Sequence, residues 1–174
     1  MTGFGRAHLM FRSFRQKVLQ GALVSGTFLN LGSPLTAEIA GKAGFDWLLI
    51  DCEHGSGDHS ELLHQLQAAG CTPAAPIVRV AWNEAPRFKR VLDLGAAGVM
   101  VPWVNNADEA RRAVAAMRYP PDGIRGVARM TRACDFGRSF DAYLACANEQ
   151  LLTVVQIETP QAVSDADSIA AVDG

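Results

Sequence analysis

The chain has 174 residues, of which 49% are hydrophobic and 20% are charged, and its formal net charge is −2. This composition is typical of a globular protein, and the length suits one domain with a sizeable core. The nearly neutral charge gives no sign of a nucleic-acid partner. No apolar run approaches the roughly 18 residues that cross a bilayer. We therefore expect neither nucleic acid nor a membrane as a partner.

The four cysteines, Cys52, Cys71, Cys134 and Cys146, show no CxxC spacing, and no secretory signal precedes them. This usage favours reduced thiols in a cytoplasmic protein over a disulfide framework. The basic N-terminal stretch lacks the apolar core and cleavage site of a signal peptide. We interpret residues 1–20 as a leader and a helix, and residues 21–174 as the folded domain.

Short apolar runs alternate along the chain with segments of helical spacing. The apolar runs predict buried strands at 23–31, 47–50, 75–80, 98–104 and 151–157. Helical spacing, caps and glycine stops predict helices at 11–21, 35–43, 58–69, 85–94, 107–118, 139–148 and 160–171. Residues 119–138, between the helices predicted at 107–118 and 139–148, are predicted to be a long loop.

Strands that alternate with helices predict right-handed βαβ units and a parallel sheet. Five such units in succession favour an α/β fold of the (β/α)8 TIM-barrel type over a doubly wound sheet. No glycine-rich nucleotide-binding motif follows any strand. Because an eight-stranded barrel needs about 250 residues, we expect this sequence to cover about the first five units of a barrel whose C-terminal part is missing.

Polar residues gather where the predicted strands end. They are Asp51, Glu53 and His54 after the second strand, Arg79 in the third, and Gln156 and Glu158 at the end of the fifth. In a barrel the C-terminal ends of the strands converge on one mouth, where active sites lie. The sequence therefore predicts one polar site at this mouth.

Each of these residues has a functional and a structural interpretation. Glu158 suits Mg²⁺ or Mn²⁺ as a hard oxygen ligand, or it caps a helix. Arg79, inside an apolar strand, needs either an internal carboxylate or the carboxylate of a ligand. His54 is a candidate general base or a loop histidine, and Asp93 either orients that histidine or ends a helix. The residue types and their positions do not decide between these alternatives.

Arginines also cluster in the predicted loop, at Arg125, Arg129, Arg132 and Arg138. They alternate with apolar residues, which indicates local anchors or small-anion contacts and not a nucleic-acid surface.

Five segments together resemble the HpcH/HpaI aldolase family, in that family's order and spacing. They are FDWLLIDCEH, APIVRV, RVLDLGAAGVMVPWVNNADEARRAV, RYPPDGIRGV and VVQIET. The resemblance implies a (β/α)-barrel aldolase that depends on a divalent metal ion (Mg²⁺, Mn²⁺ or Co²⁺). Such an enzyme reversibly cleaves 4-hydroxy-2-oxo acids to pyruvate and an aldehyde in the breakdown of aromatic compounds. The resemblance also implies that the protein forms a homo-oligomer.

The resemblance assigns catalytic roles to three residues. His54 matches the family histidine that, paired with the carboxylate matching Asp93, acts as acid and base through a metal-bound water. Asp51 matches a carboxylate close to that histidine. Because no lysine ends a predicted strand, an imine-forming aldolase is disfavoured.

The resemblance also assigns binding roles. Arg79 matches the arginine that holds pyruvate and steadies its enolate, Gln156 a neighbouring pocket residue, and Glu158 a metal ligand. The family's second metal carboxylate lies beyond Gly174, so we expect residues 1–174 alone to bind metal weakly or not at all and to be inactive as an aldolase. Phe28 stands where relatives often carry tryptophan, which suggests a different aldehyde preference. The rival interpretations are a citrate-lyase-like enzyme acting on acyl-CoA esters, and a truncated barrel that acts only through assembly.

Overall fold

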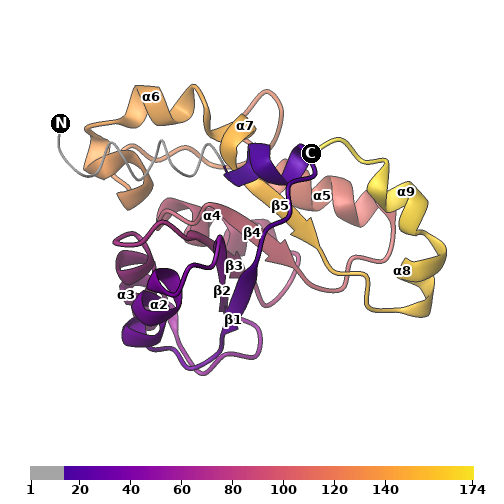
Figure 1. Cartoon of the computed structure of the whole chain (residues 1–174). Helices are drawn as coiled ribbons and strands as arrows, with labels where there is room; N and C mark the ends of the chain where they lie inside the picture. Colours follow the sequence, from indigo (N-terminus) through magenta and orange to yellow (C-terminus); the bar gives the residue numbers. More distant parts are fainter. Residues whose placement is uncertain (1–13) are drawn as a thin grey trace.

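The computed structural model describes residues 14–174. Within this range five parallel strands form one sheet, in the order in which they occur along the chain (Figure 1). The strands are β1 (Gly26–Leu29), β2 (Trp47–Asp51), β3 (Ala75–Arg79), β4 (Gly98–Val101) and β5 (Leu152–Val155). A doubly wound sheet reverses its strand order, whereas a barrel adds strands sequentially. The observed order is therefore that of a barrel.

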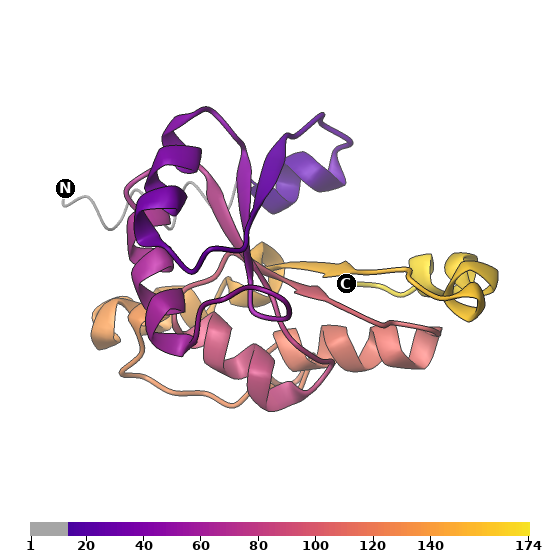
Figure 2. The same cartoon turned by 90° about the horizontal axis from the view of Figure 1, so that it is seen from below.

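Helices follow each of the strands. They are α2 (Pro34–Lys42), α3 (His59–Ala69), α4 (Ala85–Asp93), α5 (Ala107–Met117), α6 (Phe140–Leu144), α7 (Ala147–Gln150), α8 (Pro160–Ser164) and α9 (Ala166–Ala170), with helical turns η1 at Arg132–Gly137. Viewed along the sheet, α2 to α5 lie in sequence around its outer side (Figure 2). This arrangement leaves the ends of the strands open to carry a site.

Strand β2 is buried on both of its faces. Leu48 and Ile50 of β2 belong to the larger apolar cluster, which includes Phe88 of α4 and fills the space between sheet and helices. Leu49, between them in sequence, belongs to a second cluster with Phe14 from the helix over residues 14–19. Because neighbouring strand residues point to opposite faces, a continuous apolar run is what such a strand requires.

Polar caps begin several of the helices directly after the strand ends. Asp58 accepts hydrogen bonds from the backbone of Ser60 and Glu61, and its own N–H donates to Glu61 Oε2 at 2.8 Å, which completes a capping box at α3. Asn106 and Thr159 accept from the first turns of α5 and α8. These caps fix the loops at the C-terminal edge of the sheet.

The predicted strands and the helices α2 to α5 are confirmed, with boundaries that differ by a few residues. Two later predictions are wrong in detail. The single helix expected over 139–148 is two short helices, α6 and α7, and the helix expected over 160–171 is broken at Asp165 into α8 and α9. Of the first predicted helix, residues 14–19 are helical and residues 11–13 lie outside the described part.

The loop predicted after α5 contains the helical turns η1 and is held by its arginines. Arg132 Nη1 donates to the carbonyl of Leu94 at 2.6 Å, just beyond α4. The guanidinium of Arg129 lies 4.9 Å from the ring centre of Phe140, and Arg138 pairs within the segment. Their interpretation as local anchors is confirmed.

Among residues 14–174, no helix combines the length and apolar character needed to cross a membrane. The four cysteines are all free thiols, as the spacing predicted.

Candidate active site

Asp51 and Arg79 end neighbouring strands and face each other in the sheet register. Arg79 donates from Nε to Asp51 Oδ1 at 2.9 Å and from Nη2 to Oδ2 at 2.6 Å. The carboxylate side chain is fully buried, and the arginine side chain is 11% exposed. The planar fork of an arginine matches a carboxylate in this two-bond arrangement. The internal partner that a buried Arg79 needs is therefore Asp51.

Asp51 also organises the loop that follows it. Its Oδ1 accepts from the backbone N–H of Glu53 at 3.0 Å and of His54 at 3.2 Å, and its Oδ2 accepts from Asn30 Nδ2 at 2.7 Å. Burial alone would raise the pKa of Asp51, but the hydrogen bonds from Arg79 and these N–H groups outweigh it and hold the pKa below its ordinary value. Asp51 is thus ionised and fixed at neutral pH.

Glu53 and His54 lie beside this pair. Glu53 Oε2 is 3.2 Å from Arg79 Nη1, and Glu53 Oε1 is 3.7 Å from His54 Nε2. The histidine side chain is 72% exposed. Arg79 therefore bridges two carboxylates, while the imidazole of His54 is open to solvent.

The ring of Phe28, at the end of β1, covers Arg79 with its centre 5.4 Å from the guanidinium carbon. The pKa of Arg79 is raised above its ordinary value, first by the hydrogen bonds to Asp51 and further by the charges of Glu53 and Glu158. The guanidinium is consequently a permanent positive charge in this group. Glu158, from the loop after β5, is close enough to add to the local field.

Gln156 and Glu158 follow β5, next to the loop after β4. Glu158 Oε1 accepts a hydrogen bond from the backbone N–H of Trp103 at 3.1 Å. Gln156 Oε1 is buried and has no hydrogen-bond partner in the described structure. A buried acceptor without a partner is costly, so a donor supplied by a ligand or a water would stabilise it.

The strand ends therefore carry a surplus of negative charge. Three carboxylates, Asp51, Glu53 and Glu158, surround one guanidinium, that of Arg79. Hard oxygen donors with surplus negative charge suit Mg²⁺ or Mn²⁺ in kind. Among residues 14–174, however, no three His, Cys, Asp or Glu side chains gather closely enough to hold a metal ion. The described residues fit part of a divalent-ion site and not the whole of one.

Asp93 lies apart from the charged residues around Arg79. It is the last residue of α4, which runs back from the C-terminal end of β3 to the start of β4, so it sits near the opposite edge of the sheet from Asp51. Its Oδ1 is 3.0 Å from Nη2 of the fully buried Arg125. The structure does not bring Asp93 together with His54, whose ionic neighbour is Glu53. The catalytic role of Asp93 stays a prediction, and its observed contact is an internal ion pair.

Arg125 itself is held by more than that ion pair. Its Nη1 lies 3.2 Å from the hydroxyl of Tyr143, and its guanidinium carbon lies 4.4 Å from the ring centre of Tyr119. A charge buried among aromatic rings and one carboxylate anchors the long loop to α4.

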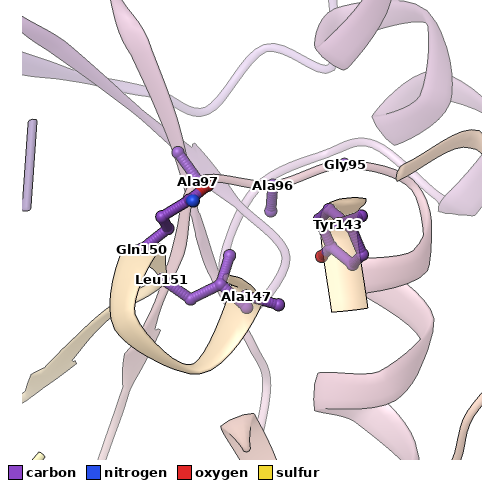
Figure 3. Close-up of a pocket in the computed structure, with 7 residues that line it drawn as sticks. All are labelled: Gly95, Ala96, Ala97, Tyr143, Ala147, Gln150 and Leu151. Atoms are coloured by element: carbon purple, nitrogen blue, oxygen red, sulfur yellow. The ribbon is translucent and has the colours of Figure 1, made fainter. Parts of the chain in front are cut away.

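Two other features near the strands do not suit a substrate. Burial, and then the charge of Asp51, raise the pKa of the Cys52 thiol to about 11, so it is not a nucleophile at neutral pH. A cavity of about 20 Å³ beside Ala97, Tyr143 and Leu151 (Figure 3) has room for about one water. The candidate site is therefore the group of charged residues at the C-terminal ends of the strands.

Sequence reasoning assigned no role to several residues of this site. Glu53 is an ionisable residue just after β2, and its position in the segment DCEH is the sequence feature that could have indicated a role in the site. Asn30, Trp103 and Asn105 contact the site loops through hydrogen bonds. No sequence pattern marks such contacts, because they depend on how adjacent loops meet.

A parallel sheet with barrel order and a charged site at its C-terminal edge is the arrangement of a TIM-barrel enzyme. Residues 24–174 match the family described as HpcH/HpaI aldolase/citrate lyase. The chain belongs to this family, and the resemblance noted in the sequence is confirmed.

Curated relatives and a solved structure agree with this assignment. The chain is 46% identical over 166 residues to a 4-hydroxy-2-oxo-heptane-1,7-dioate aldolase of Salmonella paratyphi A, covering 95% of this chain and 63% of that protein. It is 50% identical over 149 residues to a 2-dehydro-3,6-dideoxy-6-sulfogluconate aldolase of Pseudomonas putida, covering 86% and 58%. A crystal structure of an HpcH/HpaI aldolase/citrate lyase family protein from Burkholderia cenocepacia J2315 matches with a TM-score of 0.86 and 41% identity, covering 92% and 65%.

The chain thus spans less than two thirds of the length of each of these relatives. Within that span the five βα units are those of the family's TIM barrel.

Proposed function

We propose that the protein is a class II, divalent-metal-dependent aldolase that reversibly cleaves 4-hydroxy-2-oxo acids to pyruvate and an aldehyde, with a role in aromatic-compound catabolism. The observation that carries this proposal is the surplus of carboxylates around Arg79 at the strand ends. Such a site favours a divalent cation, and the cation together with the guanidinium favours a small 2-oxo acid. The two named aldolases among the relatives support the same reaction class.

Glu158 would hold the metal ion, with ligands additional to those described. When bound, a divalent ion supplies Lewis-acid stabilisation of the negative charge that develops on the 2-oxo group. Mg²⁺, Mn²⁺ and Co²⁺ are the ions we propose.

The residues of this chain account for the remaining chemistry. Arg79, fixed by Asp51 and Glu53, presents positive charge to the substrate carboxylate and to the developing enolate. His54 accepts the proton of the 4-hydroxyl group, the C3–C4 bond breaks, and its electron pair passes into the C2–C3 enolate as the aldehyde departs. C3 then takes up a proton from water and His54 releases its proton to water, which gives pyruvate and restores the base. Gln156 Oε1, buried and without a partner, offers an acceptor to a donor of the bound substrate or its water.

The lysines support a mechanism without an imine. Lys17 lies in the helix over residues 14–19, Lys42 ends α2, and Lys89 lies within α4. None of the three ends a strand at the candidate site, where a Schiff-base lysine would have to meet the carbonyl. We also propose that the protein works as a homo-oligomer.

The test is pyruvate release from a racemic 4-hydroxy-2-oxo acid by the protein expressed from its own gene, with Mn²⁺, with Mg²⁺ and with a chelator. We expect metal-dependent release that falls roughly 100-fold or more in Glu158→Gln. The matched control is Glu84→Gln, at an exposed surface pair with Arg87, which should retain activity. Metal-independent turnover that borohydride abolishes in the presence of pyruvate would contradict the proposal, because it would indicate an imine.

A further inference from the structure

Trp103 adopts a backbone conformation that large side chains rarely occupy. Its φ is 55°, in the left-handed region that glycine and asparagine tolerate and other residues avoid. It lies two residues beyond the end of β4, in the short loop that leads to the cap of α5. Strained residues of this kind persist where the surrounding contacts hold them, and they gather at functional sites.

The contacts that hold Trp103 come from Asn105. Asn105 Nδ2 donates to the Trp103 carbonyl at 3.0 Å, and the Asn105 backbone N–H donates to Glu109 Oε2 at 2.8 Å. The Thr159 hydroxyl donates to Asn105 Oδ1 at 2.5 Å, which ties this loop to the one after β5. The left-handed turn and Asn105 together define the path of the chain from β4 to α5.

The loop that Asn105 fixes points the backbone N–H of Trp103 at the neighbouring loop after β5. Strands β4 and β5 pair in parallel, with Val101 opposite Val155, so the residues just past each strand end lie side by side. The Trp103 N–H donates to Glu158 Oε1 at 3.1 Å. A glutamate side chain has several rotatable bonds, and a hydrogen bond from a fixed N–H to a carboxylate restricts it to one arrangement.

We propose that Trp103 is a positioning residue for Glu158. Its left-handed backbone, clamped by Asn105, holds the N–H that orients the Glu158 carboxylate toward a divalent ion. This inference rests on the proposed function, because it takes Glu158 as a metal ligand. The contribution comes from the backbone conformation and not from the indole, and this distinction makes it testable.

The experiment measures Mn²⁺ affinity by electron paramagnetic resonance in the protein expressed from its own gene, with variants that differ in their tolerance of positive φ. Trp103→Gly and Trp103→Asn keep the N–H and accept the left-handed conformation, so they should bind Mn²⁺ within about threefold of the parent. Trp103→Val disfavours that conformation and should bind about tenfold more weakly, the effect of losing one hydrogen bond to a charged group. Trp82→Val makes the same side-chain change at another half-exposed tryptophan, one whose φ is not positive, and should bind as the parent does.

Asn105→Ala removes the clamp without changing residue 103 and should also weaken Mn²⁺ binding several-fold. It serves as the second variant if Trp103→Val does not fold, as judged by circular dichroism and thermal unfolding. Equal affinity in Trp103→Val, Asn105→Ala and the parent would overturn the inference. So would an equal loss in the glycine, asparagine and valine variants, because the indole would then be the group that matters.

The Mn²⁺ affinity of Glu158→Gln distinguishes failure of the proposed function from failure of the positioning role. If Glu158→Gln binds Mn²⁺ as tightly as the parent, Glu158 is not a ligand, and both proposals are wrong. If Glu158→Gln loses binding while Trp103→Val retains it, only the positioning role is wrong.

Discussion

Asp51 and Arg79 end two adjacent strands at the same register and join through two hydrogen bonds, Nε to Oδ1 at 2.9 Å and Nη2 to Oδ2 at 2.6 Å. The pair fixes the only guanidinium among the site residues described, and Asp51 at the same time shapes the loop that carries Glu53 and His54. One carboxylate therefore fixes both the guanidinium of Arg79 and the loop after β2.

Asp51→Ala should destabilise the fold by about 3 kcal/mol, because it leaves a largely buried Arg79 with Glu53 alone within ion-pair distance among the described residues. The free energy of unfolding in urea measures this loss. Asp108→Ala removes an exposed carboxylate that pairs with Arg111 and should change stability by less than about 0.5 kcal/mol. Similar losses of unfolding free energy in the two variants would mean that the Asp51–Arg79 pair contributes no more to stability than an exposed ion pair does.

Stability should also depend on Asp51 at low pH. Its pKa is below the ordinary value in the folded state, and the unfolded value is about 3.9. A lowered folded pKa contributes stability above the unfolded pKa, and this contribution is lost as the pH falls through the folded pKa. The difference in unfolding free energy between the parent and Asp51→Asn should be constant above about pH 5 and should narrow below about pH 4. Urea unfolding at several pH values measures it, and a constant difference down to pH 2.5 would contradict the assignment.

Asp93 should prove important for stability in the absence of any ligand. Asp93→Ala leaves the fully buried Arg125 without its carboxylate, and we expect a loss of about 2–3 kcal/mol. Arg125→Met alone removes the charge at similar volume, and Asp93→Ala should cost much less in that background. A double-mutant cycle measured by urea unfolding gives the coupling. If the stability losses of Asp93→Ala and Arg125→Met add in the double variant, the ion pair does not account for the effect of Asp93 on stability.

Phe28 should influence which aldehyde is used. Its ring covers Arg79 and is about half exposed. Phe28→Ala and Phe28→Trp should change the ratio of kcat/KM for a small and a bulky aldehyde by about tenfold or more. They should change the enolisation of pyruvate alone much less. Steady-state kinetics with pyruvate and two aldehydes measure the ratio, and an unchanged ratio in both variants would exclude Phe28 from aldehyde selection.

The sequence was sufficient to predict the parts of the fold that depend on local patterns. The apolar run ending at Asp51 identifies β2, and the recurrence of such runs between helices predicts a parallel sheet in barrel order. Because parallel strands end at one edge, the meeting of Asp51 with Arg79 follows from their positions at the ends of β2 and β3. The capping box at Asp58 is similarly local.

Contacts between distant segments were not predictable in the same way. Arg125 lies in a predicted loop, yet it is buried because Asp93, 32 residues away, and two tyrosines surround it. The break at Asp165 has no glycine or proline to signal it. The left-handed turn at Trp103 runs against residue preference, and only the contacts with Asn105 and Glu158 account for it. Such departures from local preference are typical of functional sites.

We propose that the charged group around Arg79 stabilises a pyruvate enolate with the help of a divalent ion. The most direct test is deuterium exchange into the methyl group of pyruvate in D₂O, followed by proton NMR, because it needs no knowledge of the aldehyde. We expect exchange that requires Mn²⁺ or Mg²⁺, that stops with a chelator, and that falls at least about 100-fold in Arg79→Met and in Glu158→Gln. Exchange that proceeds equally without metal, or that survives both substitutions, would contradict it.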